Sequence, residues 1–140
     1  MHINAYLCFN GTCREAFDFY AKTMGGKIEM TMMHKDAPKD AQGPCPPEPG
    51  MENWVLHARM RIGETLIMAS DAPAPHYQKP QGTCLSLNVS SAAEADRIFT
   101  ALTPGGQIMM PIQETFYAHR FGMVTDRFGT PWMVIFPKPV

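Results

Sequence analysis

The chain has 140 residues, 45% of them hydrophobic, and a formal net charge of −1 at pH 7. A chain of this length forms one compact domain or two very small modules that share a core. The near-neutral charge gives no reason to expect nucleic acid or an acidic membrane as a partner. No apolar run approaches the ~18 residues of a membrane span, and the first residues lack a signal-peptide layout. We therefore expect a cytoplasmic protein.

Two residue types, cysteine and methionine, are open to more than one interpretation. The four cysteines (Cys8, Cys13, Cys45 and Cys84) form no CxxC pair and no zinc-ribbon spacing. In the cytoplasm we expect no structural disulfide among them. The 12 methionines are interpreted in two ways: their flexible thioethers fill irregular gaps in a core, or they form an adaptable ligand surface.

The first half of the chain predicts one helix among several strands. The helix is expected at Thr12–Met24, because Thr12 and Glu15 have the spacing of a capping box and Gly25-Gly26 stops the apolar periodicity. Five prolines in residues 34–52 predict a long loop or flap with no helix of its own. Apolar runs predict strands at residues 3–9, 27–33, 53–62 and 65–69.

Residues 71–82 have the composition of a linker, and after them the pattern begins again. Ser91 and Glu94 have the spacing of a second capping box, which predicts a helix over Ser91–Leu102. The stretch 113–136 predicts strand, turn, strand, with the reversal at Thr125–Gly129. Two further strands are expected at residues 83–89 and 108–112.

These similarities between the halves indicate an internal repeat. Both capping boxes and both Gly-Gly stops recur at an offset of about 80 residues, while the late strands align at about 66, Gly63 with Gly129. The sequence thus predicts two βαβββ modules, residues 1–70 and 83–137, within one domain. At the offset of 80, the matching positions are Leu7 with Leu87, Phe9 with Val89, Phe19 with Phe99 and Ile28 with Ile108.

A single βαβββ module cannot cover the sheet face opposite its helix, so two modules must pack together. Helices on the outside and a curved mixed sheet around a cleft follow from that packing. A cleft between modules is a common place for a small ligand.

The paired modules resemble the vicinal oxygen chelate superfamily of glyoxalase I, bleomycin-resistance proteins and extradiol dioxygenases, and most closely its PhnB-like branch. The most specific matches are Gln113–His119 and Gly129–Met133. Some members of this branch are labelled demethylubiquinone methyltransferase-like. Methyl transfer is not expected here, because no Gly-rich nucleotide loop follows a strand. Weaker matches are Tyr6-Leu7, Asn10-Gly11, Ala16–Tyr20, the Pro-rich flap, His57-Ala58 and Ile67–Asp71.

The resemblance also implies where a metal would bind. In metal-dependent relatives, four side chains, His, Glu, His and Glu, hold a divalent ion. The matching positions here are Asn4, Met68, Cys84 and Met133. One amide, one thiol and two thioethers are poor ligands for such an ion. We therefore expect no metal at this quartet, and no cofactor beyond a weakly held divalent ion.

The candidate ligand-binding residues each have a structural alternative. His57 faces the cleft if the alternate residues of its strand lie under the helices; otherwise it is a surface residue beside Arg59 and Arg61. His119 either contacts a ligand or makes a structural hydrogen bond. Glu114 is interpreted as a ligand contact or a surface charge. Tyr117, Trp54 and Trp132 stack on a planar ligand or belong to the core.

Three functions are consistent with these residues. The first is binding of a largely apolar, planar or weakly anionic small molecule without a strong metal site. The second is a metal-assisted lyase or isomerase that uses His57, His119 and Glu114. The third is a structural dimer whose flap serves a protein partner. We also expect a homodimer, because strands such as residues 108–112 would otherwise leave apolar edges exposed.

Overall fold

The computed structural model describes residues 1–38 and 48–140 and divides into two compact units, residues 1–78 and 79–140. The boundary falls inside the predicted linker. Each unit contains one α-helix and four strands in the order βαβββ, so the fold is the predicted α+β arrangement of two tandem modules. In the described part of the chain, no helix is long and apolar enough to cross a membrane.

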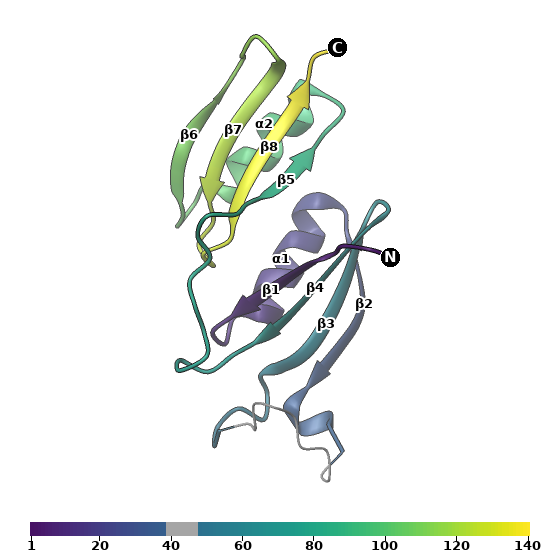
Figure 1. The fold of residues 1–140 in the computed structure, drawn as a ribbon, viewed down its shortest axis with the longest axis vertical. Helices are drawn as coiled ribbons and strands as arrows, with labels where there is room; N and C mark the ends of the chain where they lie inside the picture. The colour runs from purple at the N-terminus through teal and green to yellow at the C-terminus, as the bar shows by residue number, and fades with distance from the viewer. Residues whose placement is uncertain (39–47) are drawn as a thin grey trace. The chain divides into compact units, whose positions relative to one another are not determined.

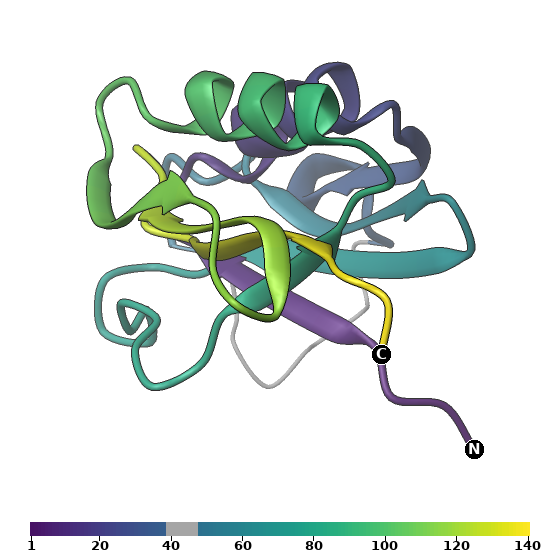
Figure 2. The same cartoon turned by 90° about the horizontal axis from the view of Figure 1, so that it is seen from above.

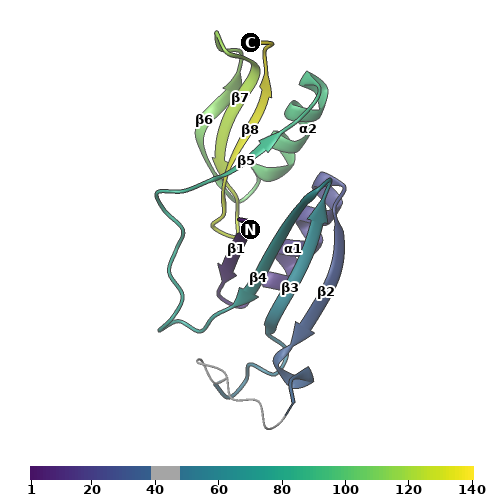
Figure 3. The ribbon, with the colours of Figure 1, turned by 45° about the vertical axis from the view of Figure 1, so that its right-hand side comes forward.

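The first unit is a four-stranded mixed sheet with a helix across one face (Figures 1 and 3). The strand order is β1-β4-β3-β2, with β1 parallel to β4 and the other neighbours antiparallel. The elements are β1 (Ala5–Phe9), α1 (Cys13–Met24), β2 (Lys27–Met33), β3 (Val55–Ile62) and β4 (Thr65–Asp71).

The second unit repeats this topology, with the strand order β5-β8-β7-β6 and the parallel pair β5 and β8. Its helix lies over one face of its own sheet, as the view from above shows (Figure 2). The elements are β5 (Leu85–Asn88), α2 (Ala92–Leu102), β6 (Gln107–Gln113), β7 (Ala118–Thr125) and β8 (Pro131–Pro137).

Each helix buries one apolar face against its own sheet. On α2, residues at a spacing of three and four are buried, because that spacing returns to the same side of a helix. Gly122 of β7 lies directly beneath this face, where a Cβ atom would be 2.7 Å from Cε2 of Phe99. The buried helix residues are Cys13, Ala16, Phe17 and Tyr20 on α1 and Ala95, Ile98, Phe99 and Leu102 on α2.

The two helices begin in different ways, and one of the predicted capping boxes is wrong. On α2, Oγ of Ser91 accepts from the amide of Glu94 at 3.1 Å, as predicted. The side chain of Thr12 accepts no capping hydrogen bond. Instead, the carboxylate of Asp71, from the end of β4, accepts from the amides of Gly11 at 2.9 Å and Cys13 at 3.0 Å. A distant acceptor has replaced the local one.

Asp71 also marks a difference in an element boundary. The linker was predicted to start at this residue, but β4 continues through it, since Asp71 pairs with Phe9 of β1. Its second carboxylate oxygen accepts from the amide of Val55 at 2.9 Å, at the start of β3. The strands β1, β3 and β5 each begin two residues later than predicted, because only their inner residues have partners in the sheets.

Part of the predicted flap contains a short helix. His34–Asp36 form a 3₁₀ turn, in which Oδ2 of Asp36 accepts from the amide of Met33 at 3.1 Å. The prediction of no helix in residues 34–52 is wrong at this end. Residues 39–47 of the predicted flap lie outside the described residues.

The strand registers support the repeat and correct its second offset. Bulges occur between Ile28 and Met30 and between Ile108 and Met110, which keeps the offset of 80 through β2 and β6. Among the late strands, Ala5 pairs with Ile67 whereas Leu85 pairs with Trp132, so β4 and β8 correspond at an offset of 65 rather than 66. The β7–β8 turn is longer than the two-residue β3–β4 turn. The alignment of Gly63 with Gly129, made from the sequence, did not include this difference in turn length.

Candidate functional site

Each sheet has one face covered by its helix and one face without a helix. In β3, Ala58 and Met60 are buried on the side of α1, so alternation places His57, Arg59 and Arg61 on the opposite, helix-free face. The alternate residues of β3 therefore lie under α1, as the first interpretation of His57 required, while its contact with a ligand stays a prediction.

On the helix-free face of the first unit, His57 stacks on Tyr6 of β1. The ring centroids are 5.8 Å apart with an angle of 26° between the planes. The hydroxyl of Tyr6 is 3.3 Å from Nδ1 of His57. Tyr6 was not among the predicted site residues. Its alternation with the buried Phe9 indicated its face, but its contact with His57 depends on the strand order β1-β4-β3, which no local pattern contains.

Two arginines share one carboxylate beside this pair. Arg61 holds Glu29, with Nε at 3.0 Å from Oε2 and Nη2 at 3.4 Å from Oε1. The hydrogen bond from Arg61 lowers the pKa of Glu29, and the same contact raises the pKa of Arg61. Arg59 is more weakly paired, since its Nη2 lies 3.8 Å from Oε1 of Glu29. Its Nε is buried and, among the described residues, has no hydrogen-bond acceptor.

The equivalent face of the second unit has a different chemistry. The pairing of Ala58 with Ala69 corresponds to that of Gly122 with Val134, so β3 and β7 correspond at an offset of 64. By this offset His57 corresponds to Phe121 and Arg59 to Met123. Likewise Tyr6 corresponds to Ser86 through the parallel pairs. The strand pairing is the same in both units, but the histidine and the arginine of the first unit are replaced by apolar side chains in the second, and the tyrosine by a serine.

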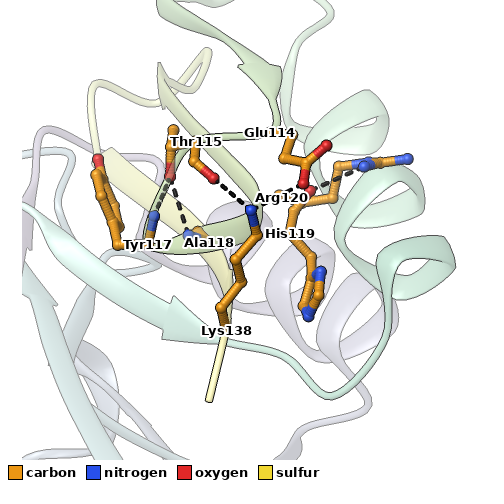
Figure 4. A network of polar contacts seen from close by, with 7 residues as sticks. All are labelled: Glu114, Thr115, Tyr117, Ala118, His119, Arg120 and Lys138. Atoms are coloured by element: carbon orange, nitrogen blue, oxygen red, sulfur yellow. Dashed lines mark hydrogen bonds and ion pairs between the residues drawn. The ribbon is translucent and has the colours of Figure 1, made fainter. Parts of the chain in front are cut away.

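A polar network follows β6 in the second unit (Figure 4). The ammonium group of Lys138 lies 2.8 Å from Oε1 of Glu114 and donates to the carbonyl of Thr115, also at 2.8 Å. The hydrogen bond from Lys138 to Glu114 lowers the pKa of Glu114. The hydroxyl of Thr115 accepts from the amides of Tyr117 and Ala118 at 3.3 and 3.0 Å, which fixes the loop before β7.

His119 and Arg120, which follow this loop, have packing partners. The ring of His119 lies 4.8 Å from that of Phe136, and within the described part of the chain its nitrogens form no hydrogen bond. Arg120 points to α2, where its Nε is 3.2 Å from Oδ1 of Asp96, and its Nη1 donates to the carbonyl of His119 at 2.8 Å. Arg120 therefore orders the backbone next to His119 and is not directed to a ligand.

The three remaining aromatic candidates have different surroundings. Tyr117 is 43% exposed and contacts the ring of Phe121 at 5.7 Å. Trp54 is half-buried against Gly11, where a Cβ atom would lie 3.0 Å from the indole. Trp132 is only 2% exposed, and its Nε1 donates to Oδ2 of Asp126 at 2.9 Å. Trp132 belongs to the core of the second unit, and burial leaves it no surface for the predicted ligand contact.

The six predicted residues thus belong to separate parts of the chain. Trp54 and His57 lie in the first unit. The other four, Glu114, Tyr117, His119 and Trp132, lie in the second. Within that unit, Glu114, Tyr117 and His119 share the network at the start of β7 (Figure 4).

The four positions matched to metal ligands occupy equivalent places in the two units. Met68 and Met133 lie beside Tyr6 and Ser86 on the helix-free faces, while Asn4 and Cys84 immediately precede β1 and β5. Across residues 1–38 and 48–140, no three His, Cys, Asp or Glu side chains come together as metal ligands would.

A separate groove lies on the other side of the first sheet, between α1 and β2. Its volume is about 340 Å³, with Phe17, Ile28 and Ala58 among its lining residues and Arg14, Asp18 and Lys35 among its charged ones. Because Ala58 is on the helix-covered face, this groove does not include His57 or Tyr6.

A helix on one face of a mixed four-stranded sheet, repeated twice along the chain, defines the fold of the glyoxalase and bleomycin-resistance proteins. The chain belongs to the family described as 3-demethylubiquinone-9 3-methyltransferase, which matches residues 1–135.

Individual relatives agree with this assignment. Protein YjdN of Escherichia coli K12 is 38% identical over 140 residues, which cover 96% of this chain and 94% of the relative. The crystal structure of PA1353 from Pseudomonas aeruginosa is 43% identical with a TM-score of 0.83, covering 97% of each chain. A PhnB protein from Bacillus cereus shares the fold with a TM-score of 0.78 at 23% identity, covering 97% of this chain and 99% of its own.

Proposed function

We propose that this protein binds a small, planar organic ligand on the helix-free surface of its sheets, without the metal quartet of the glyoxalases. The observation that carries the proposal is the stacked Tyr6–His57 pair, 5.8 Å between centroids, on a sheet face that α1 leaves uncovered. Aromatic rings at a partly exposed position provide a flat contact surface, and the imidazole provides a hydrogen-bonding group.

The metal-free part of the proposal is supported by donor chemistry. The positions that match the family's ligands hold Asn4, Met68, Cys84 and Met133. Divalent ions in open sites prefer imidazole and carboxylate groups, which neutral amide and thioether groups do not replace. Elemental analysis of protein purified without chelator or added metal tests this: we expect less than one tightly held divalent ion per chain. Stoichiometric zinc or nickel, with turnover of a glutathione hemithioacetal, would overturn it.

Neither catalytic alternative gains a specific observation. Methyl transfer from a nucleotide cofactor calls for a Gly-rich turn between strand and helix, whereas β1 leads to α1 through Asn10-Gly11 and β5 leads to α2 through Val89–Ser91. A lyase or isomerase site would use the carboxylate of Glu114, which is held by Lys138 at 2.8 Å on the surface.

We also propose that the protein acts as a homodimer. The edge strand β6 exposes Ile108, Met109 and Met110, and an apolar edge with free backbone groups favours pairing with another chain. Light scattering at micromolar concentration is expected to report twice the mass of one chain. A monomer would contradict the proposal.

Ligand binding can be tested with variants in both units. Planar aromatic compounds are screened by ligand-observed NMR, and hits are titrated into His57→Ala, Tyr6→Phe and His119→Ala proteins. We expect weaker binding in the His57 variant, by about 1–3 kcal/mol where a buried hydrogen bond is lost, with unchanged circular dichroism; weaker binding in the His119 variant would instead indicate a ligand contact in the second unit. His76→Ala, in the linker, is the matched control. Unchanged affinity in all three variants would refute the assigned surface.

The position of the ligand has an independent chemical test. Cys8 is exposed and lies on the same face of β1 as Tyr6, whereas Cys13 is fully buried, and burial raises its pKa strongly. A hit should slow alkylation of Cys8 by iodoacetamide, followed by peptide mass spectrometry, and leave Cys13 unreactive throughout. Unchanged alkylation of Cys8 at saturating ligand would place the ligand elsewhere.

A further inference from the structure

Arg59, on the helix-free face of the first unit, has an incomplete set of partners among the described residues. Glu29 is the only carboxylate paired with it in the described residues, and both oxygens of Glu29 already accept from Arg61, at 3.0 and 3.4 Å. The contact from Nη2 of Arg59, at 3.8 Å, is too long for a hydrogen bond. Its Nε is buried without an acceptor among these residues.

A buried donor without an acceptor is unfavourable, and proteins rarely keep one without a reason. The guanidinium is still accessible, because 43% of the Arg59 side-chain surface is exposed. Arg59, Arg61 and Glu29 together carry one more positive than negative charge, and Lys27, which pairs with Arg61, adds a further positive charge near Glu29. The group therefore lacks one anionic partner that can reach Arg59 from the helix-free side.

Comparison with the second unit shows that the fold does not require this cation. The same position of β7 holds Met123, and the position of His57 holds Phe121. Both units form the same sheet with these different residues. The cation and the imidazole in the first unit are therefore not explained by strand pairing or by the helix-covered core.

Register places Arg59 at a defined distance from the aromatic pair. Tyr6 pairs with Met68, and Met68 pairs with Arg59, so Tyr6 and Arg59 are two strand spacings apart in one row, roughly 10 Å. His57 is two residues from Arg59 on the same face of β3, about 7 Å along the strand. An aromatic ring against Tyr6 and His57 can thus carry an acidic group to Arg59.

We propose that the ligand of the helix-free face is a planar monocarboxylate, whose carboxylate is bound by Arg59 and whose ring packs against Tyr6 and His57. This inference rests on the proposed binding function and specifies its ligand class. The planar fork of a guanidinium matches a carboxylate with two hydrogen bonds. The single charge of the Arg59 guanidinium matches the single charge of a monocarboxylate.

The test uses 2-naphthoate and its neutral counterpart 2-naphthamide, titrated by calorimetry or NMR into the full chain. We expect 2-naphthoate to bind more tightly than the amide. Arg59→Met, which copies the second unit, should weaken 2-naphthoate binding by about 10- to 100-fold, the range of a charge-assisted hydrogen bond. It should leave the weak binding of 2-naphthamide unchanged, and its melting temperature should be equal or higher, because the unsatisfied donor is removed.

Three further variants separate charge from geometry. Arg59→Lys keeps the charge but not the fork, so it should recover only part of the affinity. Glu29→Gln should tighten binding, because it removes the compensating carboxylate. Arg14→Met, on the exposed side of α1, is the matched control and should bind as the unaltered chain does.

The outcomes are distinguishable. If acid and amide bind equally and Arg59→Met has no effect, the carboxylate assignment fails while the binding function stands. If neither compound binds, both proposals fail for planar aromatic ligands. Loss of 2-naphthoate binding in Arg14→Met as well would also overturn the assignment to Arg59.

Discussion

The two units have the same strand order and the same helix position, yet they differ in what starts the helix and in what their helix-free faces display. In the first unit a carboxylate from β4 holds the start of α1, and the free face carries Tyr6, His57 and Arg59. In the second unit a local serine caps α2, and the free face carries mainly apolar side chains. Topology therefore tolerates large differences in chemistry, as long as the helix-covered face stays apolar and closely packed.

The comparison also explains why one unit is the better candidate for recognition. An apolar free face can bury a ring but cannot orient it, since orientation needs hydrogen-bonding or charged groups. The first unit provides these groups on a rigid sheet. In the second unit, the polar groups near His119 are largely engaged with each other and with the backbone (Figure 4).

The largest expected effect is at Asp71, which has no counterpart in the second unit. Asp71 is 8% exposed, and its carboxylate accepts from three amides, those of Gly11, Cys13 and Val55. Asp71→Ala leaves these donors without acceptors, and we expect a loss of about 3–5 kcal/mol in the free energy of unfolding, measured by urea titration. Asp71→Asn keeps one acceptor oxygen, so its free energy of unfolding should lie between those of the unaltered chain and Asp71→Ala. A loss below about 1 kcal/mol would show that water replaces the carboxylate.

The next largest change in stability is expected at the glycines that follow each helix. A Cβ atom on Gly106 would overlap the backbone oxygen of Thr125, which cannot move without disturbing β7. On Gly26, its counterpart at the offset of 80, a Cβ atom would meet Cγ1 of Ile62 at 3.0 Å. We expect Gly106→Ala to destabilise the protein by about 2–3 kcal/mol and Gly26→Ala by less than about 1 kcal/mol, because a side chain can shift. Equal melting temperatures for the two variants would contradict this.

A smaller difference is expected at the residues that precede the helices. Ser91→Ala removes the 3.1 Å capping hydrogen bond and should reduce stability by about 1 kcal/mol. Thr12→Ala removes a side chain that makes no cap, so its effect should stay within about 0.5 kcal/mol. Both are measured by denaturant midpoints on the full chain. A larger loss at Thr12 than at Ser91 would reverse the assignment of the two caps.

The smallest effect concerns pH. The hydrogen bond from Lys138 lowers the pKa of Glu114 in the folded protein. A carboxylate with a lowered pKa stabilises the fold above its unfolded pKa, about 4.3, and this contribution is lost as the pH falls through the lower folded value. Lys138→Met should therefore reduce stability slightly at pH 7 and not at pH 2. Because Glu114 is exposed, the difference should also shrink in high salt. A difference that persists at pH 2 would point to lost packing of the lysine chain instead.

Much of this fold was accessible from the sequence. The turn and the Ser91 cap were predicted correctly, because each depends on neighbours within a few residues. The βαβββ repeat was also predicted correctly, because such local signals recur in both halves. The turn is one example: Oδ1 of Asp126 accepts from the amides of Phe128 and Thr130, at 2.9 and 3.0 Å. The candidate site was less accessible. Trp132 was predicted to contact a ligand because the sequence shows its position in the motif but not its burial. Tyr6 was not predicted, because its contact with His57 depends on strand order.

The sequence by itself determined the apolar alternation, the glycine stops and the family motifs, since all of these are encoded in local spacing. Only the tertiary structure decided which residue caps α1, because Asp71 follows that helix by 47 residues or more. The pairing of Tyr6 with His57 was decided in the same way, across 51 residues. Strand order brings such pairs together, and strand order depends on the packing of the whole unit rather than on any one segment.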